Sequence, residues 1–577
     1  MEKHWLICPP WSGRDELALR LNVPPVVAQI LHNRGLDDPA QARQFLQPKF
    51  NDLLAPEQLP GVTEAAGRIA AAVEAGRRIV IYGDYDVDGI TGTAILWHCL
   101  RLADADVDFY IPHRLEEGYG LNPEAIDKIA DDGANLLVTV DCGITAADSA
   151  ARARQRGIEL IVTDHHATNG QLPEHCTVVH PTALGDEYGN PHLSGAGVAF
   201  KLAWSLAQRF SGAGRVSQSY RDFLVEATGL AALGTIADVV PLVGENRILA
   251  HFGLTGLRNS QLAGLVALVE QSGLSGKKID SYHVGFWLAP RLNAAGRMGH
   301  ARLAVELLTR ADADRGRQIA EFLDSQNRQR QQVERQITEQ ARQQVTQSGM
   351  DGDAYRAIVL GGSGWHAGVI GIVASRLVDE FHRPVVLISL DDQIAQGSAR
   401  SIAGFNMYDG LARCREHLVG FGGHAMAAGL TIEADKVPAF AEAFCTHAGN
   451  VLTAQQLQPR LHLDAEVTLS DLTQPLVHQI LGLGPFGMGN PRPRLATGEV
   501  QLMGEPRVVG RGSQHLQFTV SDGQVMLKAI AFSGAPFAQP LIDHRRCRLA
   551  FKPIINEFNG RRSVELQVED VQFAGQT

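Results

Sequence analysis

Short apolar segments alternate with helix-like segments between residues 62 and 245, and this alternation constrains the fold more than any other feature. Buried strands are predicted at RRIVIYGDYD, ADVDFYIP, ANLLVTVDCG, IELIVTDHH and CTVVHP. Strands that alternate with helices predict a mostly parallel, doubly wound sheet. Ligands bind such sheets outside the carboxyl ends of the strands. We therefore expect the functional residues of this α/β lobe to follow its strands.

The chain has 577 residues, which is too long for a single core and predicts several domains. The expected division is an N-terminal helical segment (1–50), a first α/β lobe (51–270), a connecting region with a long exposed helix (271–347), a second α/β lobe (348–450) and a C-terminal β region (451–577). The expected fold class is α/β, with two α/β lobes joined by a long helix. Short strands separated by Gly and Pro turns predict an OB-like β-barrel at the C-terminus.

Composition excludes several classes of protein. Apolar residues make up 45% and charged residues 20% of the chain, as in globular proteins. No apolar run is long enough to cross a bilayer and the N-terminus lacks a signal-peptide pattern, so we expect a cytoplasmic protein without membrane partners. The seven cysteines show no CxxC pairing, which argues against disulfides and a thiolate zinc site. A net charge of −11 argues against non-specific coating of nucleic acid.

Three carboxylates stand at alternate positions in GDYDVDG, between a predicted strand and a predicted helix: Asp84, Asp86 and Asp88. Such closely spaced carboxylates repel each other unless cations neutralise them. The alternative is an Asp-rich loop that caps the following helix.

Further polar residues follow other apolar runs. Asp141 comes after LLVTV, Asp164, His165 and His166 come after LIVT, and Asp238 lies in GTIADVVPL. We interpret each as following the end of a strand, so that the sheet would gather them at one edge. Carboxylates with one or two imidazoles suit Mn²⁺ or Mg²⁺. A His-His pair taken alone is more often a loop feature.

The ordered set GDYDVDG, VDCG, TDHH and GTIADVVPL resembles the motifs of the DHH phosphoesterase family, and later segments resemble its single-strand-specific exonucleases. The resemblance covers residues from about 50 to 577 and implies two divalent metal ions. It also implies the metal ligands Asp86, Asp88, Asp141, His165 and Asp238, with Asp141 as the bridge. Asp84 and His166 would lie close to the metals or contact phosphate. Tyr82 departs from the pattern, because several relatives have a metal-binding His there.

Two metal ions can activate water and stabilise the charge that develops on a phosphodiester, with no covalent enzyme intermediate. His166 is the candidate proton donor or phosphate contact, because a His beside metals can titrate near neutral pH.

Specificity for a strand and its end has to come from other segments. GWHAGVIGIVASRL, GSARS and GGHAMAAG resemble the DHHA1 domain, which faces the metal site in this family. We expect the 5′-terminal phosphate or its neighbours to contact a polar set: Arg114, Arg297, Ser398, Arg400 and His424. The alternatives are surface or interdomain salt bridges for the arginines and simple tight bends for the Gly-rich turns.

The C-terminal region contains many arginines, with Phe518, Phe551 and Phe558 nearby. Basic grooves with aromatic platforms bind single strands with little sequence preference. Charged turns and core phenylalanines are the alternative explanation.

Three functions compete. The first is a 5′→3′ single-stranded-DNA exonuclease that releases nucleoside 5′-monophosphates, for which the resemblance implies work in recombination and repair beside a helicase and a single-strand-binding protein. The second is a phosphoesterase for pyrophosphate, oligoribonucleotides or cyclic dinucleotides, which would not need the C-terminal region. The third is a non-catalytic scaffold, which predicts lost metal ligands, whereas all five are present. We expect the first.

Overall fold

A parallel five-stranded sheet organises the first lobe, in the order β3-β2-β4-β5-β6. Its strands are β2 (Ile79–Gly83), β3 (Val107–Tyr110), β4 (Leu136–Val140), β5 (Glu159–Thr163) and β6 (Thr177–Val179). The computed structural model describes residues 3–113, 117–118, 120–168, 170–185, 188–212, 215–352, 354–391, 393–558 and 560–573. The predicted doubly wound sheet is confirmed, and its carboxyl edge lies where β2, β4 and β5 end.

Helices cover both faces of this sheet because the strands are apolar on both sides. One face packs against α6 (Pro123–Asp131) and α7 (Ala147–Gln155). The other face packs against the helices α4 (Val62–Glu74), α5 (Val87–Arg101), α8 (Gly195–Phe210) and α9 (Gln218–Ala237). The lobe continues with α10 (Gly244–Asn259), α11 (Ala263–Gln271), α12 (Ser281–His283), α13 (Ala289–Arg297) and α14 (Ala301–Thr309).

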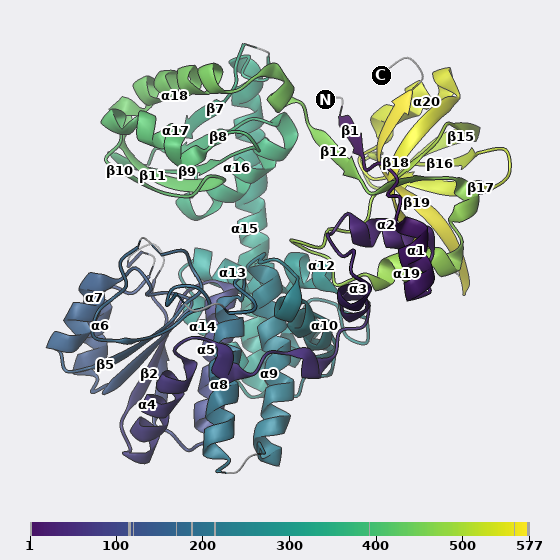
Figure 1. Cartoon of the computed structure of the whole chain (residues 1–577). Coiled ribbons are helices and arrows are strands. Elements are labelled where there is room, and N and C mark those ends of the chain that lie inside the picture. Colours follow the sequence, from purple (N-terminus) through teal and green to yellow (C-terminus); the bar gives the residue numbers. More distant parts are fainter. Residues whose placement is uncertain are drawn as a thin grey trace.

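Helix α15 (Ala313–Gln347) joins the lobes, as the sequence predicts (Figure 1). Two of its buried carboxylates face different partners. Asp324 accepts hydrogen bonds from Arg291 on α13 of the first lobe, at 3.0 Å to Nε. Glu334 pairs with Arg376 in the second lobe. The connecting helix is therefore anchored to both lobes by charge pairs.

The second lobe is a mixed five-stranded sheet in the order β10-β11-β9-β8-β7. Its elements are β7 (Ile358–Gly362), α16 (Ala367–Phe381), β8 (Val385–Ser389), β9 (Ile394–Arg400), α17 (Met407–Arg413), β10 (Gly420–Gly423), β11 (Ala427–Glu433) and α18 (Val437–Val451). Helix α16 packs between one face of the sheet and α15, while α17 and α18 cover the other face.

The C-terminal domain is a curled seven-stranded sheet in the order β13-β14-β18-β15-β16-β17-β19. Its elements, with the adjoining strand β12, are β12 (Arg460–Leu463), β13 (Ala465–Val467), α19 (Gln474–Gly482), β14 (Leu495–Thr497), β15 (Val500–Val509), β16 (His515–Ser521), β17 (Met526–Ala531), α20 (Ala538–His544), β18 (Arg546–Phe558) and β19 (Arg561–Phe573). Strand β19 also pairs with β18. The predicted OB-like domain is present, but the sheet as a whole is not closed as a barrel, because β13 and β14 extend it past β18.

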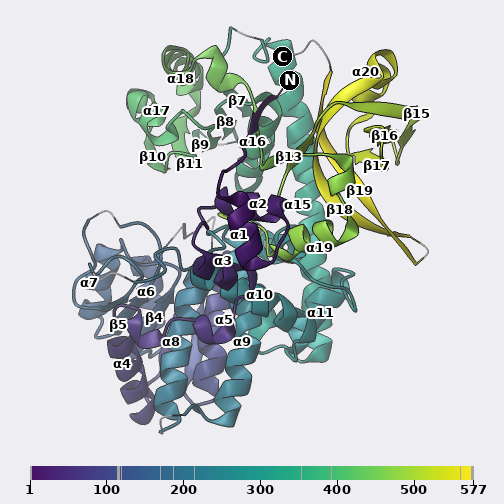
Figure 2. The ribbon, with the colours of Figure 1, turned by 45° about the vertical axis from the view of Figure 1, so that its right-hand side comes forward.

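The N-terminal segment packs on the C-terminal domain rather than standing apart. It contains α1 (Arg14–Leu21), α2 (Pro25–His32) and α3 (Pro39–Leu46), and also a strand that the helical interpretation missed, β1 (His4–Ile7). Strand β1 pairs in parallel with β12, and Figure 2 shows both ends of the chain on this side of the molecule. Apolar residues of α2 and α3 share a core with α19 and the C-terminal sheet.

Within the described ranges, every helix is too short or too polar to span a bilayer.

Candidate metal centre and phosphate-binding face

The acidic loop after β2 places its carboxylates by starting helix α5. Asp86 is the N-cap of α5, and its Oδ1 accepts hydrogen bonds from the backbone N–H groups of Asp88 (2.9 Å) and Gly89 (3.1 Å). The capping alternative is thus correct for this oxygen. Capping does not exclude a metal role, because Asp84, Asp86 and Asp141 still offer one ligand atom each within 4.8 Å of one another.

Asp88 lies in the first turn of α5 and is 1% exposed. Its Oδ2 accepts a hydrogen bond from Gly195 N (2.6 Å) and its Oδ1 one from Ala196 N (3.0 Å), both at the start of α8. A helix N-terminus stabilises negative charge. Burial and the charge of Asp86 nevertheless raise the pKa of Asp88 to about 7.

Asp141 follows β4 in the left-handed conformation, with φ +63°. Aspartate tolerates this conformation better than most residues, and it turns the carboxylate towards α8. A Cβ atom at Gly195 would lie 2.6 Å from Asp141 Oδ1, so the close approach requires glycine there. Burial, then the charges of Asp88 and Asp86, raise the pKa of Asp141 well above its ordinary value.

The two histidines after β5 have opposite properties. His165 Nε2 lies 3.0 Å from Asp141 Oδ1 and 3.5 Å from Asp238 Oδ2, and burial lowers the pKa of His165 to about 4. His166 Nδ1 lies 2.7 Å from Asp164 Oδ1. Burial opposes protonation of His166, but the hydrogen bond and charge of Asp164 outweigh it and raise the pKa of His166 to about 9. One ring is therefore neutral and the other a cation near neutral pH.

Asp164 lies at the same edge, and the sequence analysis gave it no role of its own. Its Oδ1 also accepts hydrogen bonds from the backbone N–H groups of His165 (2.7 Å) and His166 (3.1 Å), and its Oδ2 accepts one from Ile144 N (2.9 Å). Burial alone would raise the pKa of Asp164, but its contacts with His166 and these N–H groups lower it. An acidic residue directly before a His-His pair was the available signal.

Asp238 reaches the same edge from a helix. It is the C-cap of α9, so the interpretation of GTIADVVPL as the end of a strand is wrong. A buried helix that is apolar on all sides cannot be distinguished from a strand by apolar content. Burial, then the charges of Asp88 and Asp86, raise the pKa of Asp238 to about 8.

Three groups of side chains at this edge have the geometry for a metal ion. They are Asp84 with Asp86 and Asp141, Asp88 with His165 and Asp238, and Asp141 with His165 and His166. The buried atoms Asp141 Oδ1 and His165 Nε2 face each other, yet neither forms a hydrogen bond with any group in the described part of the chain. Clustered carboxylates with raised pKa values and unsatisfied ligand atoms suit hard divalent cations. The donor set therefore fits Mn²⁺ or Mg²⁺.

Tyr82 lies in the core rather than in the metal groups. Its ring stacks on Tyr110 with a centroid distance of 5.5 Å, and its hydroxyl donates to Gly120 O at 2.9 Å and accepts from Asn122 Nδ2 at 3.3 Å. Asp84 is the additional group that the structure places beside Asp86 and Asp141.

The second lobe brings several predicted phosphate contacts to one face. Arg400 Nη1 donates to Ser398 Oγ at 3.2 Å on β9, and a Cβ atom at Gly371 of α16 would lie 2.8 Å from that Oγ. His424 lies in the exposed turn between β10 and β11, and this turn is adjacent to Arg400 because Ala427 pairs with Arg400.

Arg297 ends α13 and joins the two lobes. Its Nη1 donates to Gly368 O in the first turn of α16 at 2.8 Å, an interdomain hydrogen bond to a backbone carbonyl rather than a salt bridge. His366, which sequence reasoning did not select, is the N-cap of α16 and accepts from Gly368 N at 3.1 Å. Arg114 lies outside the described residues.

The three phenylalanines that were predicted as aromatic platforms in the C-terminal domain differ in exposure. Phe518 and Phe551 are buried in the core, whereas Phe558 is 71% exposed. Several of the basic residues are paired: Arg494 and Lys552 with Glu569, Arg546 with Glu499, Arg548 with Glu466 and Arg562 with Glu557. Arg507, Arg511 and Arg561 are exposed. Core packing explains the positions of Phe518 and Phe551, and ion pairs explain most of these basic residues.

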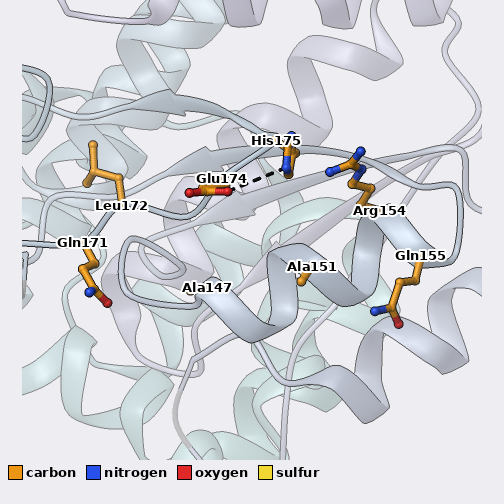
Figure 3. A pocket seen from close by; sticks show the side chains of 8 residues that line it. All are labelled: Ala147, Ala151, Arg154, Gln155, Gln171, Leu172, Glu174 and His175. Carbon is orange, nitrogen blue, oxygen red and sulfur yellow. Dashed lines mark ion pairs between the residues drawn. The ribbon is translucent and has the colours of Figure 1, made fainter.

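A pocket of about 800 Å³ lies between α7 and the segment that follows the two histidines (Figure 3). Its lining residues are Ala147, Ala151, Arg154, Gln155, Gln171, Leu172, Glu174 and His175. None of them belongs to the three metal groups, and the chemistry described above does not use this pocket.

Comparison with known proteins decides the family. Three family descriptions match successive parts of the chain: "DHH family, N-terminal domain" at residues 78–235, "DHHA1 domain" at 354–449 and "RecJ OB domain" at 463–570. The chain is 39% identical to the single-stranded-DNA-specific exonuclease RecJ of Bacillus subtilis (strain 168) over 556 residues, which cover 96% of this chain and 69% of that protein. It belongs to the RecJ family. RecJ of Escherichia coli (strain K12) is 34% identical, with 96% of this chain and 97% of that protein covered.

Solved RecJ structures agree with this assignment. RecJ from Thermus thermophilus in complex with Mn²⁺ matches with a TM-score of 0.84 and 32% identity, over 99% of this chain and 79% of that one. The complex of the same RecJ with Mg²⁺ matches with a TM-score of 0.77. The sequence predicts these same two ions for this chain. Membership of the RecJ family confirms the family resemblance and the α/β architecture.

Proposed function

We propose that this RecJ-family chain is a single-stranded-DNA-specific 5′→3′ exonuclease that releases nucleoside 5′-monophosphates by two-metal phosphodiester hydrolysis, in recombination and repair. The observation that carries the proposal is the set of three ligand groups at one sheet edge, which are linked because Asp141 and His165 each belong to two of them. Its relatives are named single-stranded-DNA-specific exonucleases, and solved RecJ structures contain Mn²⁺ or Mg²⁺.

The proposed ligands are Asp86, Asp88, Asp141, His165 and Asp238, with Asp141 shared between the two ions. Asp84 joins them as a sixth candidate because it lies within the same group as Asp86 and Asp141. When bound, two divalent ions neutralise the carboxylates, polarise the scissile phosphate and favour ionisation of a water. The backbone donors at the start of α8 hold Asp88 in place for this purpose.

His166 acts on the substrate in this proposal. Asp164 holds its Nδ1 and keeps the ring doubly protonated, with a pKa of about 9. A cation next to the carboxylate edge stabilises the negative charge on the scissile phosphate and can supply a proton to the departing oxygen.

The 5′-end preference is assigned to the second lobe. Ser398, Arg400 and Arg297 contact or lie against the first turns of α16, and helix N-termini and arginine forks both suit phosphate oxygens. A terminal phosphate held there would direct the first phosphodiester towards the carboxyl edge of the first sheet, where the three metal groups lie. We call this edge the metal edge. Arg114 and His424 are proposed to contact the same terminal phosphate or its neighbours.

The test is digestion of 5′-labelled and 3′-labelled oligonucleotides, single and double stranded, with Mn²⁺, with Mg²⁺ and with chelator. Early release of labelled mononucleotide from the 5′ end of single strands alone, lost with chelator, is the expected result. Hydrolysis of pyrophosphate or short oligoribonucleotides without DNA cleavage would instead favour the small-substrate branch of the DHH family.

The family resemblance supplies a setting for this activity. We propose that the protein works in the cytoplasm beside a helicase and a single-strand-binding protein. Stimulation of digestion by either partner, and co-purification at physiological salt, test this part separately.

A further inference from the structure

Val239, directly after Asp238, has an unusual backbone conformation. Its φ is +62°, in the left-handed region, although it is β-branched, and its side chain is 58% exposed. A β-branched residue adopts this conformation only when the surrounding structure imposes it. Val239 directly follows the C-cap of α9, where helices commonly end in the left-handed conformation but usually with Gly, and its N–H donates to Ile236 O at 3.4 Å. Because valine is poorly suited to this position, the contacts of the segment that follows bear on its conformation.

Two anchors hold that segment. Within the first lobe, Asn246 Nδ2 donates to Pro241 O at 3.0 Å. From the C-terminal domain, Met488 O accepts the backbone N–H of Leu242 at 2.8 Å. The second anchor is the unexpected one, because Met488 lies in a segment that precedes β14 and is distant in sequence from every metal-ligand candidate.

The segment from Leu483 to Asn490, here called the Asn490 loop, is built to keep its shape. Asn490 is fully buried, and its Nδ2 donates to Leu483 O (2.9 Å) and Pro485 O (2.8 Å). Its Oδ1 accepts from Arg34 Nε at 2.8 Å. One side chain therefore satisfies both ends of the loop and ties it to the N-terminal segment.

The loop also fits closely against the segment after Asp238. A Cβ atom at Gly487 would lie 2.8 Å from Leu242 Cδ1. On the other side, Arg247 of α10 donates to Gly484 O and to Phe45 O, each at 3.0 Å. The first lobe thus contacts the loop at its start, through Arg247, and again near its centre, through Leu242.

We propose that the Asn490 loop is a positioning element for Asp238 and that Asn490 is a positioning residue. The loop fixes Leu242, this contact helps to keep Val239 left-handed, and the turn at Val239 sets the direction of the Asp238 carboxylate. The C-terminal domain therefore shapes the metal centre in addition to any contact with the strand. This inference rests on the proposed role of Asp238 as a metal ligand.

The experiment measures Mn²⁺ binding by the full-length protein, using calorimetry and the electron paramagnetic resonance signal of a coupled Mn²⁺ pair. In Asn490→Ala, one of two Mn²⁺ sites is expected to weaken by at least tenfold while the other keeps its affinity, and the coupled signal appears only at higher Mn²⁺. DNA digestion should need more Mn²⁺ but regain most of its maximal rate at saturation.

The matched control is Asn33→Ala. Asn33 Nδ2 donates to Asp464 O at 2.8 Å, so this variant also removes an amide contact between the N-terminal segment and the C-terminal domain, but outside the Asn490 loop. Its Mn²⁺ binding should equal that of the unmodified protein. If Asn490→Ala does not fold, Gly487→Ala, which pushes the loop away from Leu242, provides the same comparison.

A rescue separates positioning from general loosening of the structure. Val239→Gly removes the strain that the loop is proposed to hold, so the double variant Asn490→Ala with Val239→Gly should recover the weakened Mn²⁺ site. Unchanged Mn²⁺ binding in folded Asn490→Ala and Gly487→Ala would overturn the proposal. Failure of the unmodified protein to bind Mn²⁺ or digest DNA would instead overturn the proposed function itself.

Discussion

The metal edge of the first lobe and the polar face of the second lobe are built in different ways. At the metal edge, backbone N–H groups fix Asp88 and Asp164, and the carboxylates crowd together at the cost of raised pKa values. On the second lobe, Arg400 donates to the neutral hydroxyl of Ser398 beside α16. This difference is the one that the proposed function requires, in which the first region performs the reaction and the second, with partly exposed donors, recognises a strand end.

The largest expected effect comes from breaking the metal edge at its shared ligand. Asp141→Ala should lower kcat/KM for single-stranded DNA by about 10³-fold or more, because ligand loss removes several kcal/mol of transition-state stabilisation. Asp148→Ala, an exposed aspartate on α7, is the control and should digest DNA normally. A comparable loss of activity in both variants would show that the effect of Asp141→Ala does not come from the loss of a metal ligand.

The second prediction concerns the charge on His166. Asp164→Asn should lower kcat by about 10- to 100-fold and lower the pKa of His166 from its value of about 9. Because the protonated ring is the proposed active form, activity in the unmodified protein should fall as the pH rises through about 9, and in the variant it should fall at lower pH. The pH dependence of kcat measures this. An identical alkaline limb in both proteins would remove His166 from the mechanism.

The third prediction tests the second lobe. Arg400→Ala should raise KM for oligonucleotides with a 5′-phosphate by about tenfold, since a charged hydrogen bond contributes roughly 1.5–3 kcal/mol, and should change kcat little. KM for 5′-hydroxyl oligonucleotides should hardly change. Arg413→Ala, an exposed arginine on α17, is the matched control. A kcat effect without a KM effect would place Arg400 with the metal edge instead.

The smallest expected effect is on stability without metal. Asp88 and Asp238 have folded-state pKa values of about 7 and 8, above their ordinary 3.8. Their contribution to folding is therefore present below about pH 4 and is lost as the pH rises to about 8. With chelator, Tm should fall by roughly 5 °C between pH 5 and pH 8, and Mn²⁺ should reverse this loss. Scanning calorimetry measures this change in Tm. A Tm without pH dependence would contradict the repulsion that we infer among the buried carboxylates.

Much of the architecture follows from local pattern. The strand-helix alternation predicted the first sheet, and the rule that ligands bind beyond strand ends brought Asp86, Asp141 and His165 together correctly. Asp238 was placed at the same edge for a wrong local reason, since it ends a helix. The support from Asp164, the core position of Tyr82 and the open edge of the C-terminal sheet depend on contacts between segments distant in sequence, which no local pattern contains.

The pairing of β1 with β12 has a consequence for how the chain is made. His4 lies beside Arg460 in this pairing, and α2 and α3 complete the core of the C-terminal domain. During synthesis, the segment that contains β1 must therefore wait until both α/β lobes and β12 have been made before it finds its partners. Both α/β lobes can fold while that segment is still unpaired, so its apolar side chains are the ones that cellular chaperones would meet longest.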